Sequence, residues 1–108
     1  MNEEMNRDRA AQLRQEALNS LSSYSGGFAE LERIDRQLKA IIRSLKDVAD
    51  PAWTNLLHRQ WGLLEIIYAL ALHDARSYLT EDEEIDVRNI VASLVAELQN
   101  ELPLIRED

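Results

Sequence analysis

The chain has 108 residues, a net charge of −8, 45% hydrophobic and 30% charged side chains, and no cysteine. This length suits one domain with one core, and the composition is that of a globular rather than a disordered chain. The absence of cysteine excludes disulfides, thiolate metal sites and cysteine nucleophiles. An acidic chain is also a poor candidate for binding nucleic acid or an anionic membrane, because both require Lys and Arg against phosphates.

The N-terminal residues 1–10 are polar and mixed in charge, without the apolar segment of a secretory signal. The longest apolar stretch, residues 62–72, is interrupted by Glu65. A bilayer crossing needs about 20 apolar residues, so this stretch is too short. We therefore expect a cytoplasmic protein that does not enter a membrane.

The first predicted helix covers about residues 3–22 and has a thin apolar stripe with spacings of three and four. The stripe consists of Ala10, Leu13, Ala17, Leu18 and Leu21. Residues 22–27 are serines, a tyrosine and a Gly-Gly pair, and this composition predicts a break between helices.

The second predicted helix covers about residues 28–48 and has the clearest periodicity. Its apolar residues alternate at spacings of three and four, as in the seam of a coiled coil, which suits packing at a shallow angle against another helix. They are Leu31, Ile34, Leu38, Ile41, Leu45 and Val48.

The third predicted helix covers about residues 51–78, and Asp50-Pro51 marks its start, with Asp as the cap and Pro in the first turn. One broad apolar face includes Trp53, Leu56, Leu57, Trp61, Leu64, Ile67, Tyr68, Ala71 and Ala75. A second set, Leu63, Ile66, Leu70 and Leu72, widens that face. A helix that is apolar on nearly every side is expected to be buried on most sides.

The fourth predicted helix covers about residues 81–102. Thr80 and Glu83 have the spacing of a capping box at its start, and Pro103 ends it before a loose tail of residues 103–108. Its core face consists of Val87, Ile90, Val91, Leu94, Val95, Leu98 and Leu102. Four helices joined by short connections predict an all-α fold, a single-domain four-helix bundle with antiparallel up-down topology over residues 1–108.

The charge is unevenly distributed along the chain. Residues 1–50 carry a net charge of −1 and residues 51–108 a net charge of −7. The densest acidic cluster contains Glu81, Asp82, Glu83, Glu84 and Asp86, and Asp74, Glu97 and Glu101 could extend it. Acidic residues in a first helical turn stabilise the helix dipole, which by itself would explain the cluster. The functional alternative is an anionic patch that binds a basic partner.

A basic stripe on residues 28–48 contrasts with this cluster and consists of Arg36, Lys39, Arg43 and Lys46. Glu32 and Asp35 stand four residues before Arg36 and Lys39, so ion pairs on a solvated face explain most of the stripe. Four basic residues are too weak a signal to predict RNA binding.

No pattern in the sequence predicts catalysis, a cofactor or a metal site. His58 and His73 lie 15 residues apart in one predicted helix, about 22 Å along its axis, so they cannot share a metal ion within one protomer. Asn55 and Leu70 stand three residues before them, where a di-iron bundle requires Glu. The carboxylate pairs Glu32/Asp35 and Glu81/Glu84 have the spacing found in all-α nucleotide pyrophosphatases, but a whole apolar helix separates them, so we attribute the match to chance.

Trp53 and Trp61 are either core residues or anchors for a protein partner, since Trp is favoured in both places. Gly62 lies beside Trp61 in mid-helix, where Gly costs about 1 kcal/mol relative to Ala. The close approach of another helix of the same chain, or of a second copy, would explain its presence.

These features favour a protein that acts by binding another protein rather than by catalysis. Small size, missing catalytic groups and an acidic second half suit a bacterial immunity or antitoxin-type inhibitor that neutralises a basic, nuclease-like toxin. Glu81, Asp82, Glu83, Glu84, Asp86, Trp53 and Trp61 would then form its binding surface. The alternative is a homo-oligomeric regulatory or scaffold bundle, in which the seam of the helix over residues 28–48 and the apolar helix over residues 51–78 form a homodimer interface.

Overall fold

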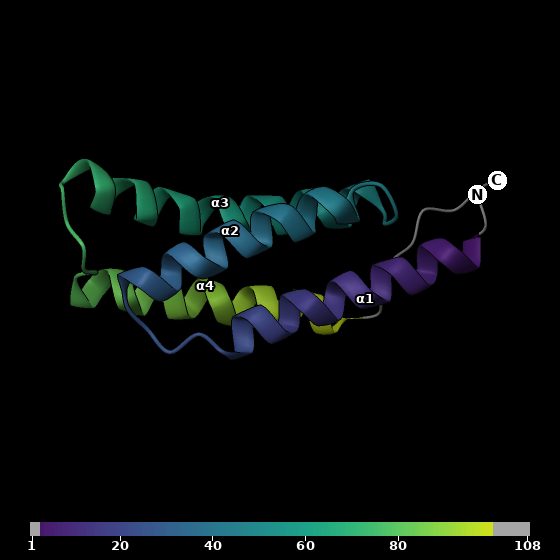
Figure 1. The fold of residues 1–108 in the computed structure, drawn as a ribbon, viewed down its shortest axis with the longest axis horizontal. Coiled ribbons are helices and arrows are strands. Elements are labelled where there is room, and N and C mark those ends of the chain that lie inside the picture. The colour runs from purple at the N-terminus through teal and green to yellow at the C-terminus, as the bar shows by residue number, and fades with distance from the viewer. Residues whose placement is uncertain (1–2, 101–108) are drawn as a thin grey trace.

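A computed structural model describes residues 3–100 of the chain. It contains four helices: α1 (Glu3–Ser22), α2 (Phe28–Leu45), α3 (Pro51–His73) and α4 (Glu81–Gln99). They lie side by side in a bundle that is 49 Å long and 22 Å by 16 Å across, with consecutive helices running in opposite directions (Figure 1). The predicted all-α four-helix bundle with antiparallel topology is confirmed.

Each helix packs mainly against its two neighbours in the bundle. Within the described residues, α1 contacts α2 and α4, and α3 contacts the same two helices from the other side. The first turns of α1 extend beyond the other helices (Figure 1). Consequently α1 and α3 lie on opposite corners, and each has an outward face that none of the other three described helices covers.

The core is built from the stripes that the periodicity predicts. It contains Ala10, Leu13, Ala17 and Leu21 from α1, Leu31, Ile34, Leu38, Ile42 and Leu45 from α2, Trp53, Leu57, Trp61 and Leu64 from α3, and Val87, Leu94 and Leu98 from α4. On α2 the buried residue is Ile42, while Ile41 is only partly buried. The predicted strict seam is wrong at this position, because an unsupercoiled helix of 3.6 residues per turn favours spacings of 3-4-4-3 here.

The starts of α3 and α4 agree with the predicted caps. The carboxylate of Asp50 accepts a hydrogen bond of 2.9 Å from the backbone N–H of Ala52, and Pro51 occupies the first turn. Thr80 Oγ1 accepts from the N–H of Glu83 at 3.1 Å, and the Glu83 carboxylate accepts from the N–H of Thr80 at 2.9 Å. Both hydrogen bonds of the predicted capping box are therefore present.

Two helices end earlier than the apolar patterns predict. Helix α2 ends at Leu45 rather than at Val48, because residues 46–49 turn the chain toward Asp50, where Pro51 disfavours helical backbone. Helix α3 ends at His73 rather than at Tyr78. Here Ala75 adopts a left-handed φ of 55°, and the N–H of Arg76 bonds back to the carbonyl of Ala71 at 2.8 Å, which is a Schellman-type ending.

The predicted end of the fourth helix at Leu102 and the predicted loose tail 103–108 lie outside the described residues. No helix within residues 3–100 has both the length and the apolarity that are needed to cross a bilayer.

Candidate functional site

The acidic cluster at the start of α4 is the first candidate surface, and much of it is engaged inside the molecule. Glu83 closes the capping box and also forms a salt bridge of 2.6 Å with Arg76, whose side chain is only 15% exposed. The Arg76 guanidinium, with help from the N–H of Thr80, lowers the pKa of Glu83 from 4.5 to about 2. Glu83 therefore stabilises the α3–α4 connection and is not free to meet a partner.

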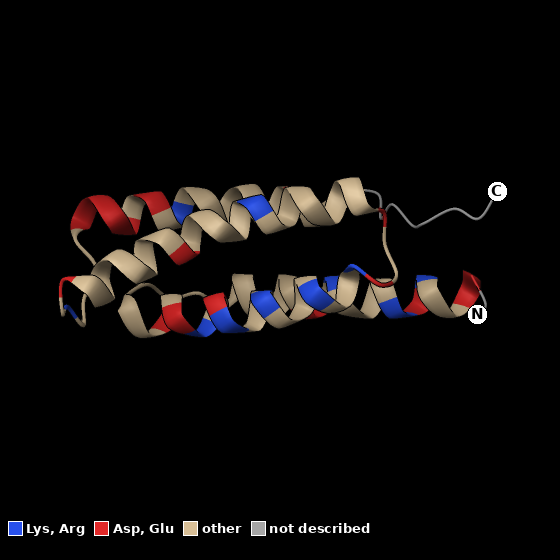
Figure 2. Cartoon of the chain, turned by 90° about the horizontal axis from the view of Figure 1, so that it is seen from above, with Lys and Arg blue, Asp and Glu red and all other residues tan. Residues whose placement is uncertain are grey.

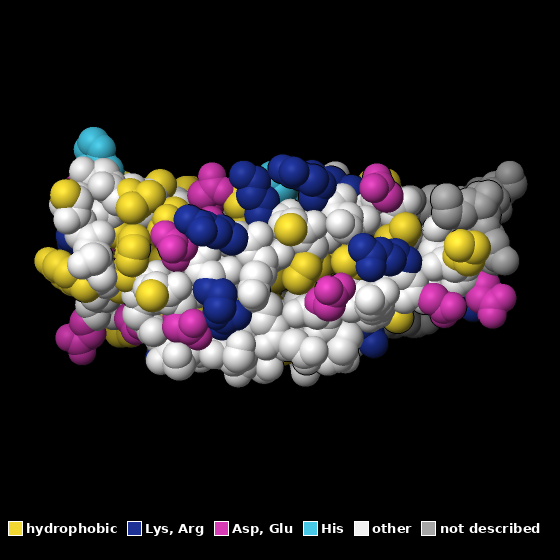
Figure 3. All heavy atoms as spheres, in the orientation of Figure 1, with side chains coloured by type: hydrophobic (Ala, Val, Ile, Leu, Met, Phe, Trp, Pro, Cys, Tyr) yellow, Lys and Arg dark blue, Asp and Glu magenta, His cyan; other side chains and the backbone are white. Residues whose placement is uncertain are grey.

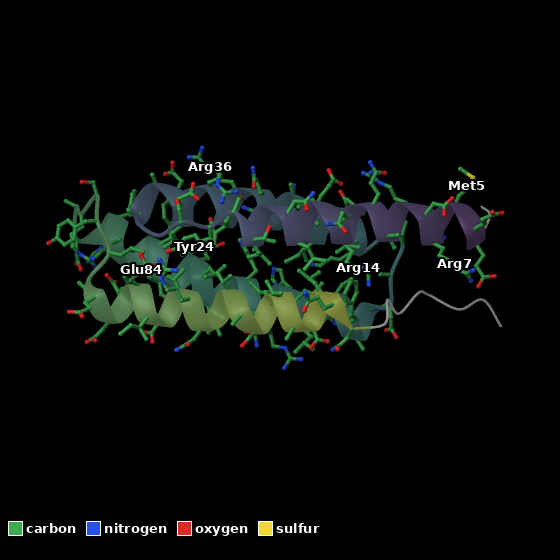
Figure 4. All side chains as sticks on the ribbon, turned by 90° about the horizontal axis from the view of Figure 1, so that it is seen from below. Met5, Arg7, Arg14, Tyr24, Arg36 and Glu84 are labelled. Atoms are coloured by element: carbon green, nitrogen blue, oxygen red, sulfur yellow. The ribbon has the colours of Figure 1, made fainter. Side chains whose placement is uncertain are left out.

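Glu84 is engaged as well, in a network that joins three parts of the chain. Its carboxylate accepts hydrogen bonds from the hydroxyl of Tyr24 at 2.5 Å and from the N–H of Gly27 at 2.7 Å. Arg88 lies 3.7 Å from the same carboxylate and stacks over the Tyr24 ring (Figure 4 shows Tyr24 beside Glu84). Burial, and then this bond to Glu84, raise the pKa of Tyr24 above its usual value.

The remaining acidic residues of the cluster are Glu81, Asp82 and Asp86, which are exposed. Figure 2 shows the start of α4 in red. Three exposed carboxylates near a helix start are also what the helix dipole favours. The structure thus divides the predicted five-residue patch into three surface residues and two structural ones.

The two tryptophans are core residues rather than exposed anchors. Each is only 6% exposed. The indole N–H of Trp61 donates to the backbone carbonyl of Asp35 at 2.9 Å and so ties α3 to α2. The indole nitrogen of Trp53 is buried without a hydrogen-bond partner among residues 3–100. Neither ring is available to a protein that docks on the surface described here, so their predicted place in a binding surface is not supported by their position.

The basic stripe of α2 is exposed along one side of the bundle, where Figure 3 shows Lys and Arg side chains over this helix. The expected pair of Glu32 with Arg36 is present at 3.8 Å. The expected pair of Asp35 with Lys39 does not form, because Asp35 is buried, and one of its carboxylate oxygens has no hydrogen-bond partner within the described chain. Burial, followed by the nearby charge of Glu65, raises the pKa of Asp35.

An open groove of about 530 Å³ lies between α1 and α2. The polar side chains around the groove form hydrogen bonds with one another. The Arg33 guanidinium donates to Glu30 and to Gln37 Oε1, both at 2.9 Å, and Ser20 Oγ donates to Gln37 Oε1 at 2.6 Å. No donor set converges on the open space, so the groove gives no reason to assign a ligand. Within residues 3–100, no three His, Asp or Glu side chains lie close enough to hold a metal ion.

An exposed apolar surface on α3 lies outside the seven residues that the sequence predicts to bind a partner. Leu63, Ile66 and Leu70, here called the α3 ridge, are 46%, 57% and 51% exposed. Their spacing of three and four places them on one face of the helix, roughly opposite the buried Trp61 and Leu64. The expectation that α3 is buried on most sides is therefore wrong for a single chain.

The surroundings of the α3 ridge contain few charges. Between Pro51 and His73 the only Asp, Glu, Lys or Arg residues are Arg59 and Glu65, and Figure 2 shows α3 as a nearly uncoloured helix with one blue and one red segment. Gly62 lies beside the ridge, and a Cβ added there would meet no atom within 4 Å. Close packing of another helix of this chain, one of the two explanations for Gly62, is excluded within residues 3–100.

Comparisons with protein-family models, curated proteins and solved structures give no match to this chain. The geometry of these surfaces is therefore the basis for assigning a function.

Proposed function

We propose that this chain is a non-catalytic, protein-binding helical bundle whose working surface is the α3 ridge. The observation that carries the proposal is the exposure of three large aliphatic side chains, Leu63, Ile66 and Leu70, on one face of one helix. Single exposed aliphatic residues are common, but a contiguous apolar patch on a helix typically marks an interaction site. Covering it would recover about 25 cal/mol per Å² of apolar surface removed from water.

The charge distribution supports α3 over the other helices as the docking element. Its outer face carries almost no charge, whereas the outer faces of α2 and α4 carry Arg36, Lys39, Glu81 and Asp82. The centre of a protein interface is depleted in charged residues, and the rim is polar. In this proposal the α3 ridge forms the centre, and the charged residues of the neighbouring helices form the rim.

Site-specific photo-crosslinking tests this proposal whatever the identity of the partner. A benzophenone amino acid replaces Ile66 on the ridge and, as a matched control, Ala92 on the exposed side of α4. We expect a light-dependent adduct of defined mass from position 66 and none from position 92, in the cells that naturally produce the protein. Absence of an adduct at position 66, or equal labelling at both positions, would contradict the proposal.

A second candidate function is inhibition of a basic, nuclease-like toxin, and one observation favours it. Glu81, Asp82 and Asp86 are exposed together and have no cationic partner within residues 3–100. Exposed carboxylates of this kind steer the association of a cationic partner.

The inhibitor candidate requires a binding surface on α4 rather than on α3. The triple variant Glu81→Gln, Asp82→Asn, Asp86→Asn leaves Glu83 and Glu84 intact. If a basic nuclease domain is encoded beside the gene, this variant should bind it more weakly and with less dependence on salt than the unmodified chain. Unchanged affinity and salt dependence would reject this candidate.

A further inference from the structure

The pattern of residues around the α3 ridge identifies its occupant. We infer that it is a second copy of this chain, bound so that the two α3 helices lie antiparallel about a two-fold axis near Ile66. This inference rests on the proposed function, because it names the partner of the same surface.

The outer face of α3 has the spacing of a coiled-coil seam. Residues 59, 63, 66, 70 and 73 follow one another at intervals of four, three, four and three. In such a seam each side chain inserts as a knob into a hole formed by four residues of the facing helix. The inner residues of α3 pack against the other helices of the same chain. The outer seam does not, so it is available to a second helix.

One antiparallel register places all three side chains of the α3 ridge in holes of the facing helix. Leu70 of one copy then enters the hole that is centred between Gly62 and Leu63 of the other. Ile66 of one copy enters a hole centred close to Ile66 of the other copy. Leu63 enters the hole centred between Ala69 and Leu70 of the other copy. All three placements share the same two-fold axis, close to Ile66, so the surface is complementary to itself as a two-fold dimer requires.

Gly62 acquires a role in this register. Among residues 3–100 no atom lies within 4 Å of the place that a Cβ at this position would occupy, and the backbone there does not need the positive φ that favours glycine elsewhere. It costs the helix about 1 kcal/mol relative to Ala, with no compensation in the isolated chain. In the dimer it is one of the four residues around the incoming Leu70, where a missing side chain leaves room for that knob.

The two charges at the ends of the seam are complementary. Arg59 is exposed and has no partner within residues 3–100. Asp74, just beyond the end of α3, has a side chain that is 54% exposed, and one of its carboxylate oxygens lies 3.3 Å from the Arg76 guanidinium, which leaves the other oxygen open to a second cation. In the register above, Arg59 lies within about 1 Å, along the helix axis, of the level of Asp74 in the second copy. The symmetry forms this pair twice. A basic protein bound to the same face would place its cationic side chains next to Arg59, and these like charges would repel.

The contact involves one helix from each copy, so it lies at the small end of specific interfaces. We therefore expect a dimer that dissociates on dilution rather than an obligate one. Sedimentation velocity over a wide concentration range tests this, using the full chain and the variants Ile66→Asp and Ile85→Asp. Ile66 and Ile85 are similarly exposed, at 57% and 52%, but Ile85 lies on α4 outside the seam.

The unmodified chain and Ile85→Asp should show the same monomer–dimer equilibrium. Ile66→Asp places two carboxylates face to face at the axis and should raise the dissociation constant by at least about 100-fold. Because both isoleucines are exposed, circular dichroism should report unchanged helix content in each variant. A chain that stays monomeric at millimolar concentration, or a dimer that Ile66→Asp leaves intact, would overturn the inference.

Disulfide trapping tests the register, since the natural chain has no cysteine. Ile66→Cys should form a disulfide-linked dimer under mild oxidation because the two thiols meet at the axis. Leu70→Cys should not, because the two copies of residue 70 are about 11 Å apart along the axis. Crosslinking at both positions would indicate a parallel pairing and would contradict the proposed register.

A charge exchange tests the pairing of Arg59 with Asp74. Arg59→Glu or Asp74→Arg alone should weaken dimerisation by about three- to tenfold, and the double variant should restore it. Additive weakening in the double variant would reject the pair. If the chain does not dimerise, the proposed function is not thereby rejected. Photo-crosslinking of position 66 to a different protein would support binding through the α3 ridge and would reject a second copy as the partner.

Discussion

The hydroxyl of Tyr24, two residues after the end of α1, donates a 2.5 Å hydrogen bond to Glu84 in the first turn of α4. The same carboxylate accepts the N–H of Gly27, which caps the start of α2. The Glu84 side chain thus ties the α1–α2 connection to the start of α4. An acidic residue that looks like part of a surface patch is a structural element of the bundle.

Replacement of Glu84 should therefore destabilise the fold, whereas replacement of its neighbour Glu81 should not. Glu84→Ala removes two hydrogen bonds to a carboxylate, and we expect the free energy of unfolding to fall by about 2 kcal/mol. Glu81→Ala is the matched control, because it removes the same charge from the same helical turn and should change stability by less than about 0.5 kcal/mol. Urea denaturation measures both, and equal effects would contradict a structural role for Glu84.

The salt bridge between Glu83 and Arg76 predicts a loss of stability in acid. The pKa of Glu83 falls from 4.5 to about 2 on folding, so its contribution is complete above pH 4.5 and is lost as the pH falls toward 2. The thermal midpoint of Glu83→Gln should lie below that of the unmodified chain at pH 6, and the two should converge near pH 2. A constant difference across this range would contradict the assignment.

Local signals in the sequence predict the helix starts, whereas contacts between distant segments are hidden from it. Asp50-Pro51 and the Thr80–Glu83 box act within four residues, so their hydrogen bonds follow from sequence alone. The engagement of Glu84 depends on Tyr24, which stands 60 residues earlier, and no local pattern reveals it. For this reason the sequence predicts an acidic patch of five residues, of which only three are exposed.

The buried carboxylate of Asp35 predicts a stabilising substitution. Burial and the charge of Glu65 raise its pKa, so ionised Asp35 opposes folding, and this cost grows as the pH rises through the raised pKa. Asp35→Asn should raise the free energy of unfolding at pH 7 by about 1 kcal/mol, with a smaller gain at pH 4. Asp47→Asn, at an exposed position, is the control. Destabilisation by Asp35→Asn at pH 7 would show that the carboxylate has a partner that stabilises it.

Gly62→Ala should have opposite effects on the single chain and on its association. A methyl group at this position meets no atom of the chain, so improved helix propensity should raise the free energy of unfolding by about 1 kcal/mol at dilution. The same methyl group narrows the hole for Leu70 of the second copy and should weaken dimerisation. Chemical denaturation at low concentration and sedimentation at high concentration separate the two effects. If Gly62→Ala stabilises the chain but does not weaken dimerisation, Gly62 is not part of the dimer interface.

The apolar pattern of α3 does not distinguish the residues that its own chain covers from those that it leaves exposed. Leu57 and Leu64 are covered by the other helices, whereas Leu63 and Leu70 are leucines of the same helix and remain half exposed. A side chain that is buried by its own chain and one that is buried by a partner look alike in a sequence, because the hydrophobic driving force is the same for both.

Association through the outer face of α3 is tested most directly by NMR. Amide chemical shifts in ¹⁵N-resolved spectra, recorded at low and high protein concentration, report on it residue by residue. We predict concentration-dependent shifts that are concentrated in residues 59–74, with residues 81–86 unchanged. Shifts that are confined to residues 81–86 or to the basic stripe of α2, with α3 unaffected, would contradict this mode of association.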